Sequence, residues 1–273
     1  MKKHFVFLIV VLVTLASCSQ YERLRKSTNY SLKYRKAFEY YGKEEYIKAG
    51  QLFDDIVSVY RGTNKADTVL YYQAMSYFKQ KDYGTGAHYF STFIKTLPTS
   101  PFAEECEYLA GYCYYKQSPR AELDQEVTNA AIESFQMFIM HYPTSKYREE
   151  AAYHLAEMQD KLVDKSYLTA KLYFNLSQYK SSIVALSNSL SDYPETKYRE
   201  ELMFLLLKSS YLYAENSVIK KQKERYQSAL DEYYSFIGEF PKSNYVKEAQ
   251  KIYEKTDSYL KNRITEEEDE KVK

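Results

Sequence analysis

The sequence predicts an all-α solenoid of about five helix pairs followed by a terminal helix. The first observation is a joint that recurs around Pro98, Pro143, Pro194 and Pro241, which are 45, 51 and 47 residues apart. A period of this size is typical of helical repeat arrays. The second observation is the residue pattern of this joint, which is that of one helix ending and another beginning. The third is that the 273 residues include only 7 Gly, which argues against a turn-dense β fold and against glycine-rich phosphate-binding loops.

Each joint has the features of one helix ending and another beginning. A large apolar residue precedes the proline, whose ring excludes a further helical turn. Acidic residues that suit the positive start of a helix follow in each copy. A hydroxyl residue two positions after the proline is expected to be the N-cap of the next helix. These expected caps are Ser100, Ser145, Thr196 and Ser243.

The N-terminus has the pattern of a secreted lipoprotein. Lys2 and Lys3 precede an apolar run, residues 5–15, that is too short to span a bilayer. Leu15-Ala16-Ser17-Cys18 then resembles the bacterial lipobox, in which the cysteine is acylated and becomes the first residue of the mature chain. We expect residues 1–17 to be a signal peptide and Cys18 to carry a diacylglycerol and an N-acyl chain, which together make a stable anchor. The alternative is an ordinary signal peptide with an incidental cysteine.

The residues after Cys18 predict the location of the mature chain. Ser19 is not the Asp that retains many such lipoproteins in the inner membrane, and no acidic cluster of the kind that directs surface export follows. We therefore expect an outer-membrane protein on the periplasmic face. Residues 18–29 have no clear periodicity and are expected to be a tether, which could reach at most about 35–40 Å.

The second repeat is the clearest. Its run Tyr77-Phe78-Lys79-Gln80-Lys81-Asp82-Tyr83 resembles the turn of a tetratricopeptide repeat, with Lys81 in place of the usual glycine. Ala74 and Gly86 fall where small residues let two helices cross closely, and Phe90 falls where a large residue fills the gap. The corresponding positions of the first repeat are Ala37, Ala49 and Phe53.

The later repeats are less regular. An insertion is expected at 118–126, and the fourth repeat is expected to contain two separate helices, Lys146 to about Lys161 and Lys165 to Leu176. A second insertion is expected at 216–224. A last helix should end near Asn262, which gives a repeat domain over residues 30–262. The like-charge run in 263–273 predicts a disordered acidic tail.

Aromatic residues of the first three repeats predict a binding groove. In tetratricopeptide stacks the first helix of each pair faces the concave side, so an extended or helical apolar segment could lie there, with a terminal carboxylate near a lysine. The alternative is that these aromatic residues simply pack between neighbouring helices. The predicted groove residues are Tyr34, Phe38, Tyr41, Tyr71, Met75, Phe78, Lys79, Tyr108, Tyr112, Tyr115 and Lys116.

The sequence offers no catalytic or metal-binding constellation. Cys106 and Cys113 are expected to be buried small residues, because their spacing puts them about 10 Å apart along one helix axis. The histidines of the expected helices have no second ligand four residues away. We therefore predict a non-enzymatic protein with no cofactor besides the acyl chains and no metal. The net charge of +1 gives no indication of nucleic-acid binding.

The lipobox, the tether and the ordered repeats together resemble the BamD (ComL) family of lipoproteins of the outer-membrane β-barrel assembly machine. The segments Asp160–Tyr173 and Ser181–Glu195, with their extra helix and Asp-Tyr-Pro-Glu-Thr joint, carry the most specific resemblance. The resemblance implies that the C-terminal repeats bind the Omp85-type barrel protein BamA. It also implies that the N-terminal repeats receive C-terminal segments of unfolded outer-membrane proteins.

A second interpretation is a lipoprotein that resembles SusD, binds glycans and works with a TonB-dependent transporter. Chains of that class are normally longer and interrupt their repeats with a large loop-rich part, whereas this chain is nearly all repeat.

Overall fold

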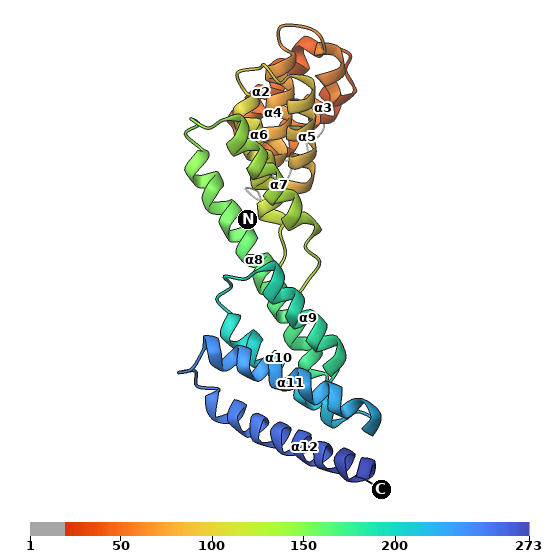
Figure 1. Cartoon of the computed structure of the whole chain (residues 1–273). Coiled ribbons are helices and arrows are strands. Elements are labelled where there is room, and N and C mark those ends of the chain that lie inside the picture. The colour runs from red at the N-terminus through yellow and green to blue at the C-terminus, as the bar shows by residue number, and fades with distance from the viewer. Residues whose placement is uncertain (1–19, 273) are drawn as a thin grey trace, which may run out of the picture. The chain divides into compact units, whose positions relative to one another are not determined.

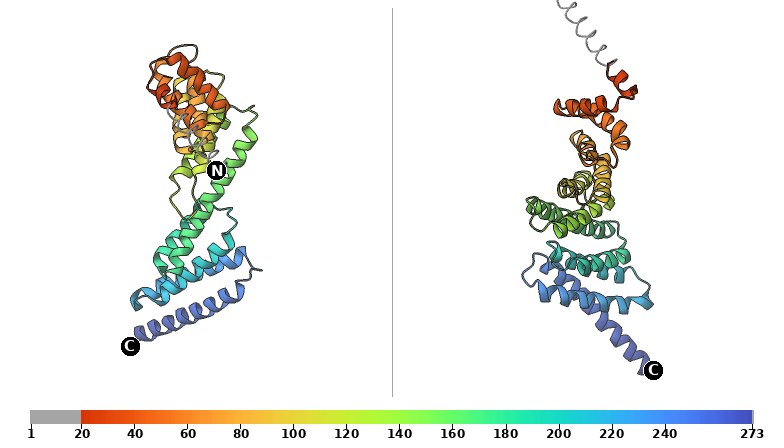
Figure 2. Two further views of the ribbon diagram at one scale, coloured as in Figure 1. Left: turned by 180° about the vertical axis from the view of Figure 1, so that it is seen from behind. Right: turned by 90° about the horizontal axis from the view of Figure 1, so that it is seen from above.

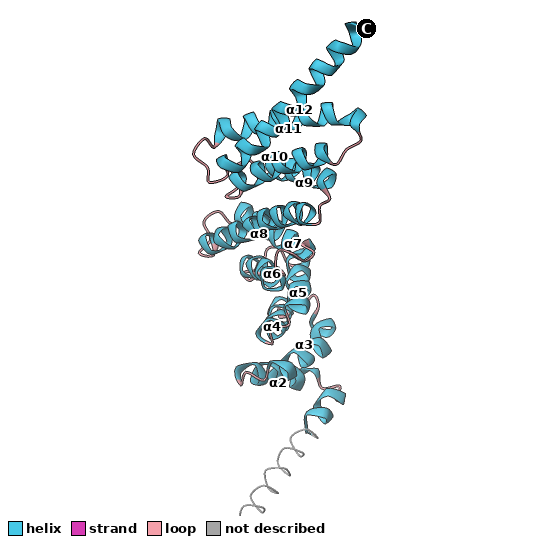
Figure 3. Cartoon of the chain, turned by 90° about the horizontal axis from the view of Figure 1, so that it is seen from below, coloured by secondary structure: helices cyan, strands magenta, loops and turns pink. Residues whose placement is uncertain are grey.

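The computed structural model describes residues 20–272, with side chains described from 20 to 262. This part of the chain consists of helices joined by loops and turns and contains no strand (Figure 3). Two compact units are present, residues 20–119 with 125–158, and residues 120–124 with 159–272. Within each unit, helices that follow one another in the chain lie side by side (Figures 1 and 2). The predicted class, an all-α stack of helix pairs, is confirmed.

The first unit contains three complete helix pairs. In chain order these helices are α2 (Tyr30–Gly42), α3 (Tyr46–Tyr60), α4 (Ala66–Lys79), α5 (Tyr83–Thr96), α6 (Ala103–Gln117) and α7 (Glu126–His141). Helix α8 (Arg148–Asn175) begins in the first unit and ends in the second. The second unit continues with α9 (Tyr179–Asp192), α10 (Arg199–Glu215), α11 (Ile219–Glu239) and α12 (Val246–Val272).

Small residues and phenylalanines fill the contacts inside each pair, as the repeat pattern predicted. Ala37, Ala49 and Phe53 have no exposed surface in the first pair, and Ala74 and Phe90 have none in the second. Gly111 lies so close to the next helix that a Cβ there would stand 3.0 Å from Cδ1 of Phe135. Cys106 and Cys113 are free and fully buried, in agreement with the prediction.

The turns inside three pairs share one backbone geometry. Glu44, Lys81 and Ser177 have left-handed φ values of 62°, 63° and 57°. The N–H groups of Lys81 and of the next residue bond back to the carbonyl oxygens of Phe78 and Tyr77, at 2.9 and 3.1 Å. This is the usual way in which a helix end satisfies its last carbonyl groups, with glycine as the preferred left-handed residue. Lys81 therefore takes the conformation of the glycine that it replaces.

The joints differ from the prediction in one respect. The hydroxyl residues are not the N-caps, because each helix begins five residues after the proline and the cap position of α6 is Phe102. Instead, the hydroxyl oxygen accepts the N–H of the residue two positions later, in a local turn that precedes the helix. These bonds run from Phe102 N to Ser100 Oγ, Tyr147 N to Ser145 Oγ, Tyr198 N to Thr196 Oγ1 and Tyr245 N to Ser243 Oγ, at 3.3, 3.0, 3.3 and 3.0 Å.

Three predicted boundaries were wrong. The fourth repeat has one continuous helix, α8, in place of the two expected, because nothing between Arg148 and Asn175 is a helix breaker. Where a loop was expected at 216–224 the structure has only a short turn, because α11 already begins at Ile219. The last helix continues to Val272 instead of ending near Asn262, so the segment expected to be disordered is helical as far as the structure describes it. The insertion after α6 is present as a loop.

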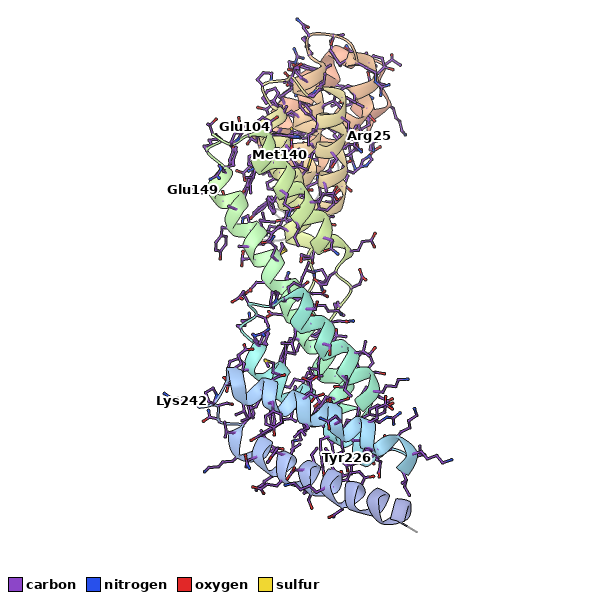
Figure 4. All side chains as sticks on the ribbon, in the orientation of Figure 1. Arg25, Glu104, Met140, Glu149, Tyr226 and Lys242 are labelled. Atoms are coloured by element: carbon purple, nitrogen blue, oxygen red, sulfur yellow. The ribbon has the colours of Figure 1, made fainter. Side chains whose placement is uncertain are left out.

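The expected tether is also different. Residues 20–26 are helical and pack against the first helix pair. Tyr21 is 7% exposed, and its hydroxyl donates to Gln51 Oε1 at 2.7 Å. Asp55 accepts from the buried Lys33 Nζ at 2.9 Å and from Arg25 Nη2 at 3.4 Å (Figure 4 labels Arg25). This segment is therefore part of the folded body. Cys18 and the signal peptide lie outside the described residues.

Candidate peptide-binding surface

The predicted groove residues lie on α2, α4 and α6, and most of them contact a neighbouring helix. On α2, Phe38 and Tyr41 are half-buried, and each places its ring 4.9 Å from the ring of Tyr72 on α4. Tyr34, also half-buried, contacts Phe38 at 4.9 Å and Tyr60 on α3 at 5.1 Å. Each ring of this aromatic layer is therefore partly covered by a neighbouring ring.

On α4 the residues divide into buried and accessible ones. Tyr71 and Met75 are each 8% exposed, which makes them core residues. Phe78 is half-buried and contacts Tyr112 of α6 at 6.1 Å. Lys79 is exposed, and no ion pair involves it among the residues that the structure describes. The part of α4 that a ligand could touch is therefore its C-terminal turn.

On α6 the same division holds. Tyr108 is 4% exposed, whereas Tyr112 and Tyr115 are half-buried. Lys116 is exposed and lies 5.3 Å from the ring of Tyr112 and 5.7 Å from that of Tyr115, within the range of a cation–π contact. The structure thus brings Phe78, Tyr112 and Tyr115 together beside the Lys116 ammonium group.

Tyrosine hydroxyl groups tie consecutive first helices together. Tyr71 on α4 donates to Glu105 on α6 at 3.0 Å, and Tyr115 on α6 donates to Glu157 on α8 at 3.0 Å. Burial, with the Glu157 carboxylate next, raises the pKa of Tyr115 to about 12. Burial and the neighbouring Glu105 carboxylate likewise raise the pKa of Tyr71. These hydroxyl groups are therefore neutral donors at any physiological pH.

A second contact between repeats was missed at the level of sequence. The aromatic residue four positions after each joint proline lies flat on an aromatic residue of the preceding first helix. The spacing of the joint contained the signal, because all four copies have Phe or Tyr at this position. The stacked pairs are Tyr71–Phe102, Tyr108–Tyr147, Tyr167–Tyr198 and Phe204–Tyr245, with centroid distances of 4.3, 4.6, 3.9 and 4.4 Å.

The joint hydroxyl residues also reach across a repeat. Ser145 Oγ donates to Glu104 Oε1 at 2.6 Å, and Figure 4 labels Glu104 at the start of α6. The acidic residues that the sequence associates with helix starts therefore have a second role as acceptors for the neighbouring repeat.

His154 on α8 is a further residue that sequence reasoning missed as a partner of the surface. It is 7% exposed, and its ring lies in a tilted contact with Tyr115, 4.1 Å between centroids, and 5.4 Å from the ring of Tyr112. Its Nδ1 is 3.5 Å from Glu157 Oε2, the acceptor of the Tyr115 hydroxyl. His154 and Glu157 therefore hold Tyr115 in one orientation.

A cavity of this unit lies apart from the predicted surface. A cavity of about 510 Å³ is lined by Glu45, Ile47, Lys48 and Gln80, among others, near the turns of the first two pairs. None of the predicted groove residues lines it. The accessible part of the predicted surface therefore consists of partly buried aromatic rings beside an exposed lysine, outside this cavity.

Within residues 20–262, no three His, Cys, Asp or Glu side chains are placed to share a metal ion. None of the helices described here combines the length and the apolar character needed to cross a bilayer.

Comparisons with known proteins agree with this fold. The family model YfiO, described as an outer membrane lipoprotein, matches residues 27–225. The outer membrane protein assembly factor BamD of Caulobacter vibrioides is 24% identical over 117 residues, 43% of this chain and 38% of that protein. BamD of Rickettsia prowazekii is 22% identical over 179 residues, 66% of this chain and 71% of that protein.

One solved structure, the TPR2AB-domain:pHSP90-complex of yeast Sti1, covers 84% of this chain and 98% of that chain, with a TM-score of 0.37 and 13% identity. The match to the family model extends over most of the repeats, from the last residues before α2 into α11. The chain belongs to the YfiO family of outer membrane lipoproteins, the family of the BamD assembly factors.

Proposed function

We propose that this protein is a non-enzymatic, lipid-anchored scaffold of the outer-membrane β-barrel assembly machine. The observation that supports the proposal is the family match over residues 27–225, because relatives of this chain are named as outer membrane protein assembly factors. Stacks of helix pairs such as this one offer extended surfaces for other proteins. Its partners are an Omp85-type barrel protein, BamA, and C-terminal segments of unfolded outer-membrane proteins.

The direct test is an affinity purification from detergent-solubilised outer membranes with a tag after Lys273, followed by mass spectrometry. Stoichiometric recovery of an Omp85-type barrel protein is expected. Recovery of a TonB-dependent transporter in its place would contradict the proposal and favour glycan uptake.

Anchoring requires its own test. Acylation of Cys18 would hold the body at the periplasmic face of the outer membrane. Cells grown with labelled palmitate should yield a labelled wild-type protein and an unlabelled Cys18→Ala protein. Cys113→Ala is the matched control, because that buried thiol should not affect the label. Label that persists in Cys18→Ala would contradict the anchor.

We propose that the accessible part of the aromatic face, around Phe78, Tyr112, Tyr115 and Lys116, contacts the unfolded proteins. Tyr71 is a poor probe of this contact because it is buried and bonded to Glu105. Lys116→Glu, an exposed change, should weaken the binding of a peptide from the C-terminus of a barrel protein. Met140→Ala on α7, also exposed, should leave binding unchanged. Equal binding by all three proteins would remove this surface from the proposal.

A further inference from the structure

A small pocket in the C-terminal unit lies between α10 and α12. Its volume is about 240 Å³, smaller than the roughly 300–1,000 Å³ that drug-sized ligands occupy, so it has room for about one side chain. Tyr211, Leu212 and Ile252 form its apolar part, and Tyr211 and Ile252 are 6% and 7% exposed. Both helices belong to one unit, so the pocket is complete within it.

Three lysines line the same pocket, and only one of them is neutralised. Lys208 Nζ lies 2.7 Å from Glu248 Oε1. Lys251 and Lys255 are one helical turn apart and exposed, and neither has an ion-pair partner among the residues whose side chains are described. Lys255 Nζ lies 5.8 Å from the ring centroid of Tyr211. The lining therefore has two uncompensated positive charges beside an apolar surface.

The hydroxyl group of Tyr211, which belongs to the apolar part of the pocket, already has a hydrogen-bond partner. The Tyr211 hydroxyl donates to Glu215 Oε1 at 2.7 Å. A ligand group that enters the pocket therefore meets carbon atoms first, whereas a group at its edge meets the Lys251 and Lys255 ammonium groups. This combination selects an apolar side chain that is attached close to an anion.

We propose that this pocket binds the last residue of an extended polypeptide, with its apolar or aromatic side chain against Tyr211 and Ile252 and its free C-terminal carboxylate at Lys251 and Lys255. A terminal residue bears both groups on one Cα atom, which fits a cavity that holds about one side chain. An internal acidic residue offers the carboxylate without the apolar group. The inference rests on the proposed function, and it assigns the terminal carboxylate to the C-terminal unit instead of to Lys79 or Lys116.

The test uses the full mature chain in detergent and fluorescent ten-residue peptides of alternating apolar and polar residues that end in phenylalanine. One peptide has a free C-terminal carboxylate, a second ends in an amide, and a third ends in an amide but has glutamate as its penultimate residue. Binding is measured by fluorescence anisotropy for the wild type, for Lys251→Glu/Lys255→Glu and for the matched pair Lys79→Glu/Lys116→Glu. Far-ultraviolet circular dichroism checks that the helices are retained.

The free-acid peptide should bind the wild type about tenfold or more tightly than either amidated peptide, since charge-assisted hydrogen bonds are lost with the carboxylate. Lys251→Glu/Lys255→Glu should abolish this difference. Lys79→Glu/Lys116→Glu should weaken the binding of all three peptides through the aromatic face but should preserve the ratio between the free acid and the amides. The inference is overturned if amidation has no effect, if the glutamate peptide binds as well as the free acid, or if only the Lys79 and Lys116 changes remove the difference. In each of these cases the purification of an Omp85-type partner still decides the proposed function separately.

Discussion

The ring of Tyr167 lies flat on the ring of Tyr198, with 3.9 Å between the centroids and 9° between the planes. Both hydroxyl groups are engaged as well, because Tyr167 donates to Glu201 and Tyr198 donates to Asp164, each at 2.8 Å. One residue of this pair belongs to the joint after Pro194, and the other belongs to the preceding first helix. The pair therefore couples one repeat to the next.

Tyr198→Ala should lower the free energy of unfolding of the C-terminal unit by about 2–4 kcal/mol, because it removes a stacked ring and its buried area. Tyr198→Phe keeps the ring and should cost about 1 kcal/mol, the worth of one hydrogen bond. Urea titrations followed by circular dichroism measure both values. Equal losses for the two variants would show that the ring stack contributes little.

Gly111→Ala should destabilise the first unit by about 1–3 kcal/mol, because the added Cβ would stand 3.0 and 3.1 Å from two carbon atoms of the Phe135 ring. Gly86→Ala is the matched change in the neighbouring pair. Its Cβ would meet nothing closer than 3.4 Å, so the helix propensity of alanine should make it neutral or stabilising by up to about 1 kcal/mol. Thermal unfolding ranks the two variants by stability, and Gly111→Ala is expected to be the less stable. The reverse ranking would contradict the close helix crossing at Gly111.

Lys81→Gly should stabilise the protein by up to about 1 kcal/mol. Lys81 has a left-handed φ of 63°, which costs residues with a Cβ more than it costs glycine, although glycine also gains freedom in the unfolded chain. Arg35→Gly, at an exposed position inside α2, should instead destabilise by about 1 kcal/mol. Denaturant midpoints of the two variants should move in opposite directions. A loss of stability in both would mean that the turn strain is negligible.

Glu201 should contribute an acid-sensitive part of the stability. Burial alone would raise the pKa of Glu201, but the hydrogen bonds from Lys171 and Tyr167 outweigh it and hold the pKa below the ordinary value of 4.5. A carboxylate with a lowered pKa in the folded state stabilises above its unfolded pKa and loses this contribution as the pH falls through the folded one. The free energy of unfolding should therefore fall more steeply below about pH 4.5 in the wild type than in Glu201→Gln. Parallel curves for the two proteins would remove Glu201 as the cause.

The docking of residues 20–26 predicts protection from proteases. In the wild type, trypsin should cut slowly after Arg23 and Lys26, because Tyr21 and Arg25 hold this segment on the first helix pair. Tyr21→Ala should speed this cleavage, whereas Ile47→Ala, a change at an exposed residue of the same pair, should not. Mass spectrometry of timed digests identifies the cut sites. Equally fast cleavage in the wild type would mean that the segment is not docked.

The sequence was sufficient to predict the helix pairs, because prolines, small crossing residues and large fillers recur with the period of the repeats. It misplaced what depends on distant partners. The docking of Tyr21 needs Gln51, thirty residues away, and a short helical segment has too few residues to show a periodicity. Two helices were expected where α8 is continuous, although no residue within Arg148–Asn175 favours a break.

The candidate surface was predicted only in part, for a similar reason. Sequence position placed Tyr71 and Tyr108 on the correct helices, but their exposure depends on Phe102 and Tyr147, which stack on them from the following joints. From the sequence alone, an aromatic residue at such a position is equally compatible with a buried core and with an exposed binding face. The pocket at Tyr211 and Ile252 requires α10 and α12 to be neighbours, which only the packing reveals.

Because residues 20–26 are docked on the first helix pair, almost no flexible linker remains between the folded body and the proposed anchor at Cys18. Two peptide units separate Cys18 from Gln20, where the described helix begins, and they span at most about 7 Å. With so short a linker the folded body cannot reorient freely above a bilayer, and the first helix pair would stay next to the lipid headgroups. The protein would then present only a restricted set of orientations to partners embedded in the same membrane. This restriction raises the effective concentration of those of its surfaces that face such partners.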